Sequence, residues 1–181
     1  MPPLSRPAPA PITTPAGTLR ALTHADLPAA LAIQSLSYPA FLQEDEPAFV
    51  SRLDVAAPYC QAAERDGSLV GYLLAHGWPA ASPPPVGQRL DPKAPSEVLF
   101  IHDLAISPAG RGAGVGRALV DRAFTLAALD GLSRAELIAV EGAADYWRGL
   151  GFAEAEASPA LAAKVAGYGP RARWMTKRIG R

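Results

Sequence analysis

The sequence lacks most of the features that mark secreted, membrane-spanning or metal-clustering proteins. Its 181 residues contain a single cysteine, Cys60, which excludes an intrachain disulfide and a zinc site built from cysteines. No segment approaches the roughly 18 continuous apolar residues of a membrane-spanning helix. The first residues have no basic region followed by an apolar region, so no secretory signal is predicted and a cytoplasmic location is expected.

The chain also lacks an excess of either charge. It carries 17 basic and 17 acidic side chains, so its formal net charge is zero. Residues 1–103 contain 6 basic and 10 acidic side chains, whereas residues 104–181 contain 11 and 7. A nucleic-acid-binding protein is not indicated, because no uniformly basic surface is predicted.

What is present indicates one globular domain. Apolar residues make up 49% of the chain and charged residues 19%, and the length suits a single core. Residues 1–17 are rich in proline, alanine and threonine and lack periodicity, so we predict a disordered tail there. The domain is expected to span residues 18–181.

Hydrophobic patterning predicts strands and helices in alternation, and therefore a mixed α/β sheet of about seven strands flanked by helices. Asp66-Gly67 is a strong turn signal for a hairpin. A long proline-rich loop follows at 79–96. The predicted strands are 18–22, the two arms of the hairpin within 59–78, 97–106, 134–140, 152–157 and 171–179, and the predicted helices lie within 23–38, 46–57, 116–130 and 142–151.

The most informative segment is a glycine-rich connection, "SPAGRGAGVGRAL" (107–119), between a predicted strand and a predicted helix. Backbone N–H groups at a helix start bind anions, and glycines let a phosphate approach closely. A Walker A loop is excluded because Gly116 is followed by Arg117 and not by Lys-Ser/Thr. The dinucleotide pattern is poorly met, because the glycines alternate strictly and no acidic residue stands at the end of the following strand until Glu141.

A third pattern fits better. The loop contains R-x-x-G-x-G, it follows "DLAISP", and "YWRGLGF" (146–152) stands downstream. Together these segments resemble the acetyl-CoA site of the GNAT superfamily of N-acetyltransferases. The resemblance implies a single α/β domain of α+β type with a mixed, mostly antiparallel sheet. It implies acetyl-CoA as co-substrate, no metal, and cofactor contacts from the strand residues Leu104, Ala105 and Ile106 and the loop residues Arg111, Gly112, Ala113, Gly114, Val115, Gly116 and Arg117.

His102 is the candidate general base, because a histidine near neutral pKa suits removal of a proton from an amine. Within the family, "IHDLAI" looks closest to arylalkylamine N-acetyltransferases, whose strand carries two histidines; one maps onto His102 and the other falls on Phe100. Alternation places His102 and Leu104 on one face of the strand and Asp103 on the other, unless a bulge intervenes. A purely structural histidine is the alternative.

The general acid is less clear from the sequence. The family usually places a tyrosine four residues before the glycine of its Gly-Phe pair, and here that position is Trp147. Tyr146 stands one residue earlier, which is a rotation of about 100° on a helix. Tyr146 therefore acts as the acid only if it is re-aimed; otherwise water protonates the thiolate. Trp147 is expected either to contact the CoA sulfur or to pack in the core.

The resemblance implies that the acceptor lies between the first two helices and the far edge of the sheet. Glu44, Asp45 and Glu46 favour a cationic amine, or they are a solvated acidic loop. Four apolar or aromatic side chains either form an apolar wall for an aryl or alkyl amine or belong to the core: Tyr38, Phe41, Leu42 and Phe49. The loop at 79–95 is expected to cover this region.

The sequence therefore predicts an acetyl-CoA-dependent N-acetyltransferase that acts on a small primary amine by direct attack in a ternary complex, as a monomer or a homodimer. A protein N-terminal or lysine acetyltransferase and a non-catalytic acyl-CoA-binding module of the same fold are alternatives. A nucleotide-binding domain is a more distant one.

Overall fold

The computed structural model describes residues 7–180. Its strands form one eight-stranded sheet with the order β1-β2-β3-β4-β5-β6-β8-β7. Neighbouring strands are antiparallel except for the parallel pair β5 and β6. This confirms the predicted mixed, mostly antiparallel α/β domain. The strands are β1 (Ile12–Thr14), β2 (Gly17–Ala21), β3 (Gln61–Arg65), β4 (Ser68–Trp78), β5 (Val98–Ile106), β6 (Arg134–Ala139), β7 (Ala153–Glu154) and β8 (Arg173–Arg178), and the helices are α1 (Leu27–Ser37), α2 (Glu46–Asp54), α3 (Val115–Leu129), α4 (Ala144–Gly149) and α5 (Pro159–Ala166).

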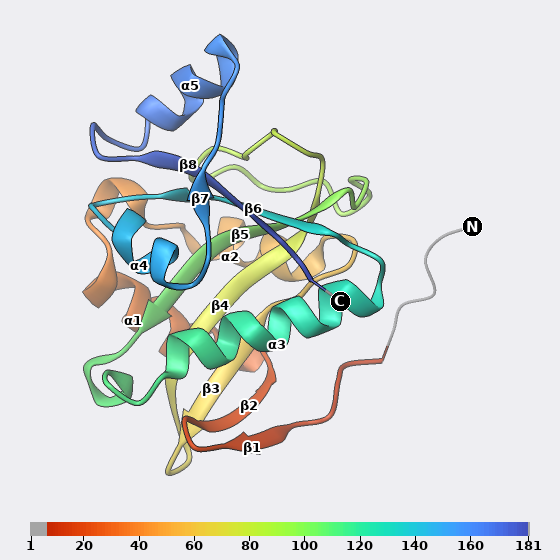
Figure 1. The fold of residues 1–181 in the computed structure, drawn as a ribbon. Helices are drawn as coiled ribbons and strands as arrows, with labels where there is room; N and C mark the ends of the chain where they lie inside the picture. Colours follow the sequence, from red (N-terminus) through yellow and green to blue (C-terminus); the bar gives the residue numbers. More distant parts are fainter. Residues whose placement is uncertain (1–6, 181) are drawn as a thin grey trace.

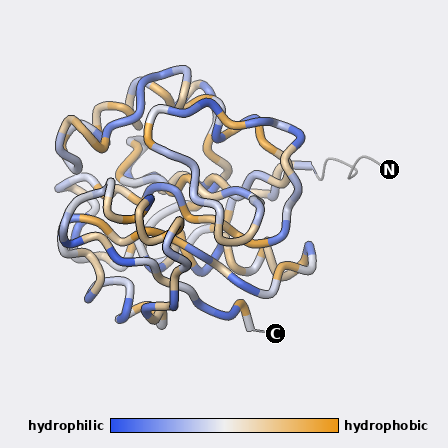
Figure 2. The backbone as a smooth tube through the Cα atoms, turned by 90° about the horizontal axis from the view of Figure 1, so that it is seen from above, coloured by the Kyte–Doolittle hydropathy of each residue, from blue (hydrophilic) through white to orange (hydrophobic). Residues whose placement is uncertain are grey.

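The helices cover both faces of the sheet, α3 on one and α1 and α2 on the other (Figure 1). Apolar side chains of α3 at helical spacing, such as Leu119 and Ala123, pack on Leu73 and Leu99 of the central strands. On the opposite face Phe49 of α2 packs against β4. Hydrophobic residues accordingly run through the middle of the molecule (Figure 2).

Local signals in the sequence fix the two turns that frame the central strands. Asp66 and Gly67 connect β3 to β4 with φ angles of 50° and 75°, as the two-residue hairpin turn requires. Gly131 ends α3 with φ 86°, and the N–H of Leu132 donates to the carbonyl of Ala127. The left-handed conformation at this position suits glycine and satisfies a free carbonyl of the last helical turn.

The predicted disordered tail is wrong for residues 12–17. Ile12–Thr14 form β1 and pair with β2, and Arg122 of α3 donates a hydrogen bond to the carbonyl of Ala10. Composition missed this strand because its stability comes from pairing with an edge of the sheet and not from its own pattern. Residues 1–6 of the predicted tail lie outside the described residues.

Helix α5 was not predicted, and the strand predicted at 152–157 is limited to the two residues of β7. The signal for α5 was present: the Ser158 side chain accepts from the N–H of Leu161, and Pro159 occupies the first turn. Leu161 and Val165 pack against Phe100 and Trp174, so α5 extends the apolar layer over β5 and β8.

Candidate active site

The two parallel strands at the centre of the sheet separate part-way along their length. β5 and β6 pair only from Leu99 to Ile101, opposite Ala135 to Leu137. A cavity of about 430 Å³ opens where the strands diverge, lined by the second half of β5, by residues after α1 and after β6, and by α4. The end of pairing therefore exposes one backbone edge of β5 to this cavity.

A β-bulge lies at the point where the strands separate. Leu74 of β4 is opposite Asp103 and the next residue, Ala75, is opposite Ile101, so His102 is the extra residue in β5. The bulge brings His102 and Asp103 to the same face of the sheet: the His102 ring lies near His76, and Asp103 accepts from the Tyr72 hydroxyl.

The alternation predicted for this strand is therefore wrong beyond His102. Asp103 shares the face of His102, and Leu104 packs with the core under α3 instead. The physical reason is the residue inserted by the bulge, which shifts the side-chain period by one position.

The backbone beyond the bulge alternates between two sides. Ser107 N–H donates to the carbonyl of Val70 on β4, so the N–H of Ala105, two residues earlier, also faces β4. The N–H groups of Leu104 and Ile106 face the open side. Of the three strand residues predicted to contact the cofactor, these two have the orientation that the prediction needs, and all three line the cavity.

The glycine loop forms a second hollow of about 480 Å³ at the start of α3. Gly112 and Gly114 have φ angles of 79° and 75°, and no atom lies within 4 Å of the position that a Cβ would occupy at either residue. Gly116 and Val115 line this hollow too, whereas Ala113 packs against the core. Backbone amides at a helix start, facing open space, fit the pyrophosphate of coenzyme A.

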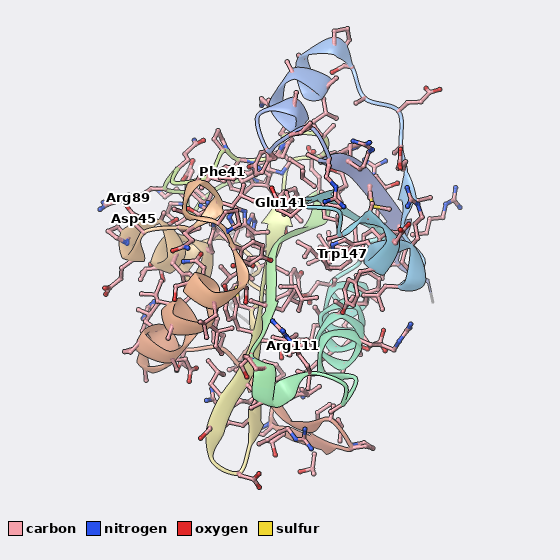
Figure 3. The ribbon with its side chains drawn as sticks, turned by 90° about the vertical axis from the view of Figure 1, so that its left-hand side faces the viewer. Phe41, Asp45, Arg89, Arg111, Glu141 and Trp147 are labelled. Carbon is pink, nitrogen blue, oxygen red and sulfur yellow. The ribbon has the colours of Figure 1, made fainter. Side chains whose placement is uncertain are left out.

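Arginines and aromatic residues connect the two hollows. Arg111 and Tyr146 line both, as does Ile106. In Figure 3 the Arg111 side chain lies beside the end of β5, with Trp147 above it toward α4. Arg117 donates to the carbonyl of Gly149, 2.9 Å away, and so ties α3 to the end of α4. The route from the glycine loop to the bulge is therefore continuous.

The two aromatic residues of α4 have different surroundings. Trp147 is 7% exposed and packs on Phe152, although it also lines the cavity. Tyr146 is 47% exposed, and its hydroxyl lies 2.2 Å from the position of a Cβ on Gly116. The structure thus places the Tyr146 hydroxyl over Gly116 in the first turn of α3, whereas Trp147 belongs to the buried core.

His102 is held by a buried carboxylate. Its Nε2 lies 2.6 Å from Oε1 of Glu44, which also accepts from Arg52 at 2.9 Å. Glu44 is 5% exposed and Arg52 is fully buried. The predicted solvated acidic loop is therefore wrong for Glu44, because an ion pair with Arg52 and a hydrogen bond with His102 compensate its burial. Asp45 caps α2, and Glu46 is exposed.

A family model described as "Acetyltransferase (GNAT) family" matches residues 27–152. The chain belongs to the GNAT acetyltransferase family. No curated protein sequence matches the chain significantly.

Solved structures show the same fold. The ribosomal-protein-S18-alanine N-acetyltransferase from Escherichia coli is 18% identical with a TM-score of 0.63, over 90% of this chain and 94% of that one. Ard1 from Thermoplasma volcanium is 16% identical with a TM-score of 0.68, over 92% and 99%. Rv2747 from Mycobacterium tuberculosis, solved in complex with CoA, is 20% identical with a TM-score of 0.64, over 88% and 98%. At such identities the likeness concerns the fold alone, and the resemblance to arylalkylamine enzymes stays a prediction.

The buried ionisable groups of this GNAT site, His102, Glu44 and Asp103, have shifted pKa values. Burial and the charge of Arg52 lower the pKa of His102, although Glu44 acts in the opposite direction, so the imidazole is neutral at pH 7. Burial acts to raise the pKa of Glu44, but the hydrogen bond from His102 and the charge of Arg52 outweigh it and lower that pKa. Burial raises the pKa of Asp103 to about 6, despite the hydroxyls of Tyr72 and Tyr38.

Sequence reasoning did not predict Tyr168 in the site, expected only an apolar role for Tyr38, and placed Asp103 on the face away from His102. Asp103 lines the cavity, and its Oδ1 is buried without a hydrogen-bond partner among the described residues. The Tyr38 hydroxyl donates to the carbonyl of Leu104, 2.7 Å away, which fixes the open edge of β5. Leu42 also lines the cavity, whereas Phe49 is core and Phe41 is 59% exposed.

The proline-rich loop contributes Val86 to the lining of the cavity, and it is held in place by hydrogen bonds. Gly87 N–H donates to Glu44, and Arg52 donates to the carbonyl of Gln88. The Tyr168 hydroxyl donates to the carbonyl of Pro84 at 2.7 Å, which joins the loop to the segment after α5. Val86 and Tyr168 therefore form a fixed, largely apolar wall.

Within residues 7–180 no group of three or more histidine, cysteine, aspartate or glutamate side chains is arranged to hold a metal ion. In the same range no helix is long and apolar enough to cross a membrane.

A buried histidine beside the site makes the stability of the protein depend on pH. His76 is fully buried against the rings of Trp78 and Phe100, and burial lowers its pKa to about 3. An unfolded histidine titrates near 6.5. Between these values the unfolded chain binds a proton that the folded chain does not, so the free energy of unfolding decreases as the pH falls.

We expect His76→Phe to flatten this dependence between pH 6.5 and pH 4. The substitution removes at most about 1.4 kcal/mol per pH unit from the pH dependence of the free energy of unfolding. Urea denaturation of both proteins across this range measures it, and the exposed His24→Phe serves as the control. Parallel pH profiles for wild type and His76→Phe would refute a neutral, buried His76.

Proposed function

We propose that the protein transfers an acetyl group from acetyl-CoA to a small primary amine, by direct attack of the amine within a ternary complex. The single observation that carries this proposal is the continuous path from the start of α3 to the bulge. It passes Arg111, Tyr146 and Ile106, which line both hollows. A thioester lying along this path would bring its acetyl group to the buried side chains of His102 and Asp103.

The residues of the chain have separable roles in this proposal. Amides at Gly112, Gly114 and Gly116 and the cationic side chains of Arg111 and Arg117 bind the pyrophosphate. The Leu104 N–H, on the open edge of β5, donates to the thioester carbonyl oxygen as negative charge develops there. Bound acetyl-CoA supplies the activated acetyl group, and the protein orients it and moves protons.

His102 is proposed to take the proton of the attacking amine, because its imidazole is neutral and lines the cavity. Asp103 is the second candidate, since its carboxylate lies on the same face with one free oxygen. A carboxyl with a pKa of about 6 is largely ionised at pH 7 and is able to accept a proton. Comparison of Asp103→Asn with His102→Ala assigns the role. The base is the residue whose loss makes kcat/KM fall more steeply than in wild type as the pH falls.

Tyr146 is proposed to protonate the departing thiolate. Its hydroxyl lies over Gly116, and burial raises its pKa although the charge of Arg117 opposes this, so the hydroxyl keeps its proton at neutral pH. Tyr146→Phe is expected to lower kcat about 100-fold with little change in the KM for acetyl-CoA.

The control for Tyr146 is Tyr59→Phe, which removes a hydroxyl that bonds Asp130 and lines neither hollow. Steady-state kinetics on both variants measure the effect. Equal kcat values for the two variants would show that the thiolate takes its proton from water.

The shape of the acceptor end supports a small molecule over a protein chain. An N-terminus or a lysine side chain needs an open groove for the flanking polypeptide, but here Val86 and Tyr168, joined through the Tyr168–Pro84 hydrogen bond, form a wall at the acceptor end of the cavity. Leu42 and Phe100 add apolar surface, which suits an amine on an aryl or alkyl group. The enzymes from Escherichia coli and Thermoplasma volcanium share only the fold and do not decide the acceptor.

A CoA-release assay over arylalkylamines, polyamines, amino acids and peptides tests the function. Release of CoA with a small apolar amine, but not with peptides, is the expected result. Turnover on peptides alone would favour a protein acetyltransferase. Tight binding of acetyl-CoA without CoA release on any amine would instead support a non-catalytic acyl-CoA-binding module.

A further inference from the structure

We propose that Glu44 is a positioning residue that fixes the tautomer of His102, with the proton on Nε2 and the lone pair on Nδ1. The proposal rests on the proposed function for its catalytic meaning, because a base must present an unprotonated nitrogen to the amine. Its structural content, the location of one proton in the free protein, is independent of turnover.

The first step is the state of Glu44. Its Oε1 accepts from Arg52 Nη2 at 2.9 Å, and its Oε2 accepts from the Gly87 N–H at 2.7 Å. Both partners only donate, and neither is able to give up its proton at neutral pH. Burial acts to raise the pKa of Glu44, but its hydrogen bonds and the charge of Arg52 outweigh it and lower that pKa, so the carboxylate is ionised at neutral pH with both oxygens acting as acceptors.

The second step is the consequence for the imidazole. Nε2 of His102 lies 2.6 Å from Oε1 of Glu44, and an ionised carboxylate has no proton to donate. Nε2 must then carry the proton, and in a neutral imidazole Nδ1 is the acceptor. Among residues 7–180 no protein group hydrogen-bonds Nδ1, which leaves this nitrogen for a substrate.

The third step is the balance of charge around the ring. Glu44, from the segment before α2, offsets the buried positive charge of Arg52 from α2. The other ionisable groups that face His102 are His76 of β4, which is neutral, and Asp103 of β5. The pair Glu44–Arg52 is thus neutral as a unit, so it orients the imidazole without supplying a net charge that would hold it protonated.

The fourth step separates Glu44 from residues that only build the fold. Glu136 is its closest match in the chain, because it is 1% exposed, pairs with Arg134, and accepts from the N–H of Ala81 in the same proline-rich loop. Glu136 has no histidine partner among its described contacts. Glu136→Met therefore perturbs the loop to a similar degree without touching His102.

The decisive measurement is two-bond ¹H–¹⁵N correlation on histidine-labelled wild-type protein without substrate. The chain has three histidines, and the His102→Gln spectrum assigns the signal. We expect a protonated Nε2 and an unprotonated Nδ1 for His102 at pH 7.5. The reverse tautomer, or a doubly protonated ring, would overturn the proposal.

Variants then test the consequence for catalysis. Glu44→Met removes the acceptor that faces Nε2 at nearly constant side-chain length, so we expect the Nε2-protonated tautomer to lose its dominance and kcat to fall about 100-fold, with the KM for acetyl-CoA unchanged. Glu44→Asp should restore part of the kcat and the original tautomer, and Glu136→Met should keep both. An unchanged tautomer in folded Glu44→Met would contradict the role of Glu44.

The two proposals fail separately. If wild type shows the expected tautomer but releases no CoA with any amine, the proposed function is wrong and the positioning by Glu44 stands. If amines are acetylated but the tautomer is reversed, the function stands and Glu44 does not set the proton.

Discussion

Gly114→Glu is expected to abolish the binding of acetyl-CoA. Gly114 precedes α3 with φ 75°, and the space beside its Cα is open. A carboxylate introduced there would lie among the amides that are proposed to bind the pyrophosphate, and it would repel that group. Isothermal titration calorimetry with acetyl-CoA measures the change, and we expect a loss of at least about 100-fold, or about 2.7 kcal/mol.

The matched control is Gly131→Glu at the other end of the same helix. Gly131 has φ 86° and equally open surroundings, so both substitutions force a residue with a Cβ into the left-handed region at a cost of about 1–2 kcal/mol. Gly131→Glu should lose stability and keep its affinity. Wild-type affinity for acetyl-CoA in Gly114→Glu would contradict the assignment of this loop as the pyrophosphate site.

His102→Ala is expected to cause the largest loss of turnover, roughly 10³-fold in kcat/KM near pH 6.5. Without a base, only the fraction of amine that is already unprotonated reacts, and this fraction falls tenfold for each pH unit below the pKa of the amine. In wild type the lowered pKa of His102 keeps the imidazole able to accept a proton down to acidic pH. The ratio of the two rates should therefore grow as the pH falls.

A pH series of kcat/KM from 6 to 9 on one amine tests this expectation. His24→Ala is the control, since His24 is exposed and lies against Asp54, outside both hollows. A ratio of wild type to His102→Ala that stays constant over the series would show that His102 is not the base and would turn attention to Asp103.

The sequence predicted the parts of the molecule whose structure depends on near neighbours along the chain. The hairpin at Asp66-Gly67, the strand β5, the glycine loop and the end of α3 at Gly131 all follow from turn chemistry and periodicity. The family match over residues 27–152 confirms the resemblance read from the loop and its flanking segments.

The parts that were missed depend on contacts between distant segments. β1 exists because an edge of the sheet is available to Ile12–Thr14, and no local pattern announces such pairing. The bulge at His102 depends on the register of β5 against β4. Glu44 reads as one of three acidic residues in a row, and only the fold reveals that it meets Arg52 and His102 in the interior.

The attached proline-rich loop also has a thermodynamic consequence for the acceptor site. Prolines restrict the unfolded chain, so ordering this segment during folding costs less conformational entropy than ordering a flexible loop of the same length. Arg52, Glu44 and Tyr168 hold it in place before any amine arrives. Binding of an acceptor therefore costs little conformational entropy in this loop, and selection among amines depends on their fit to a preorganised surface.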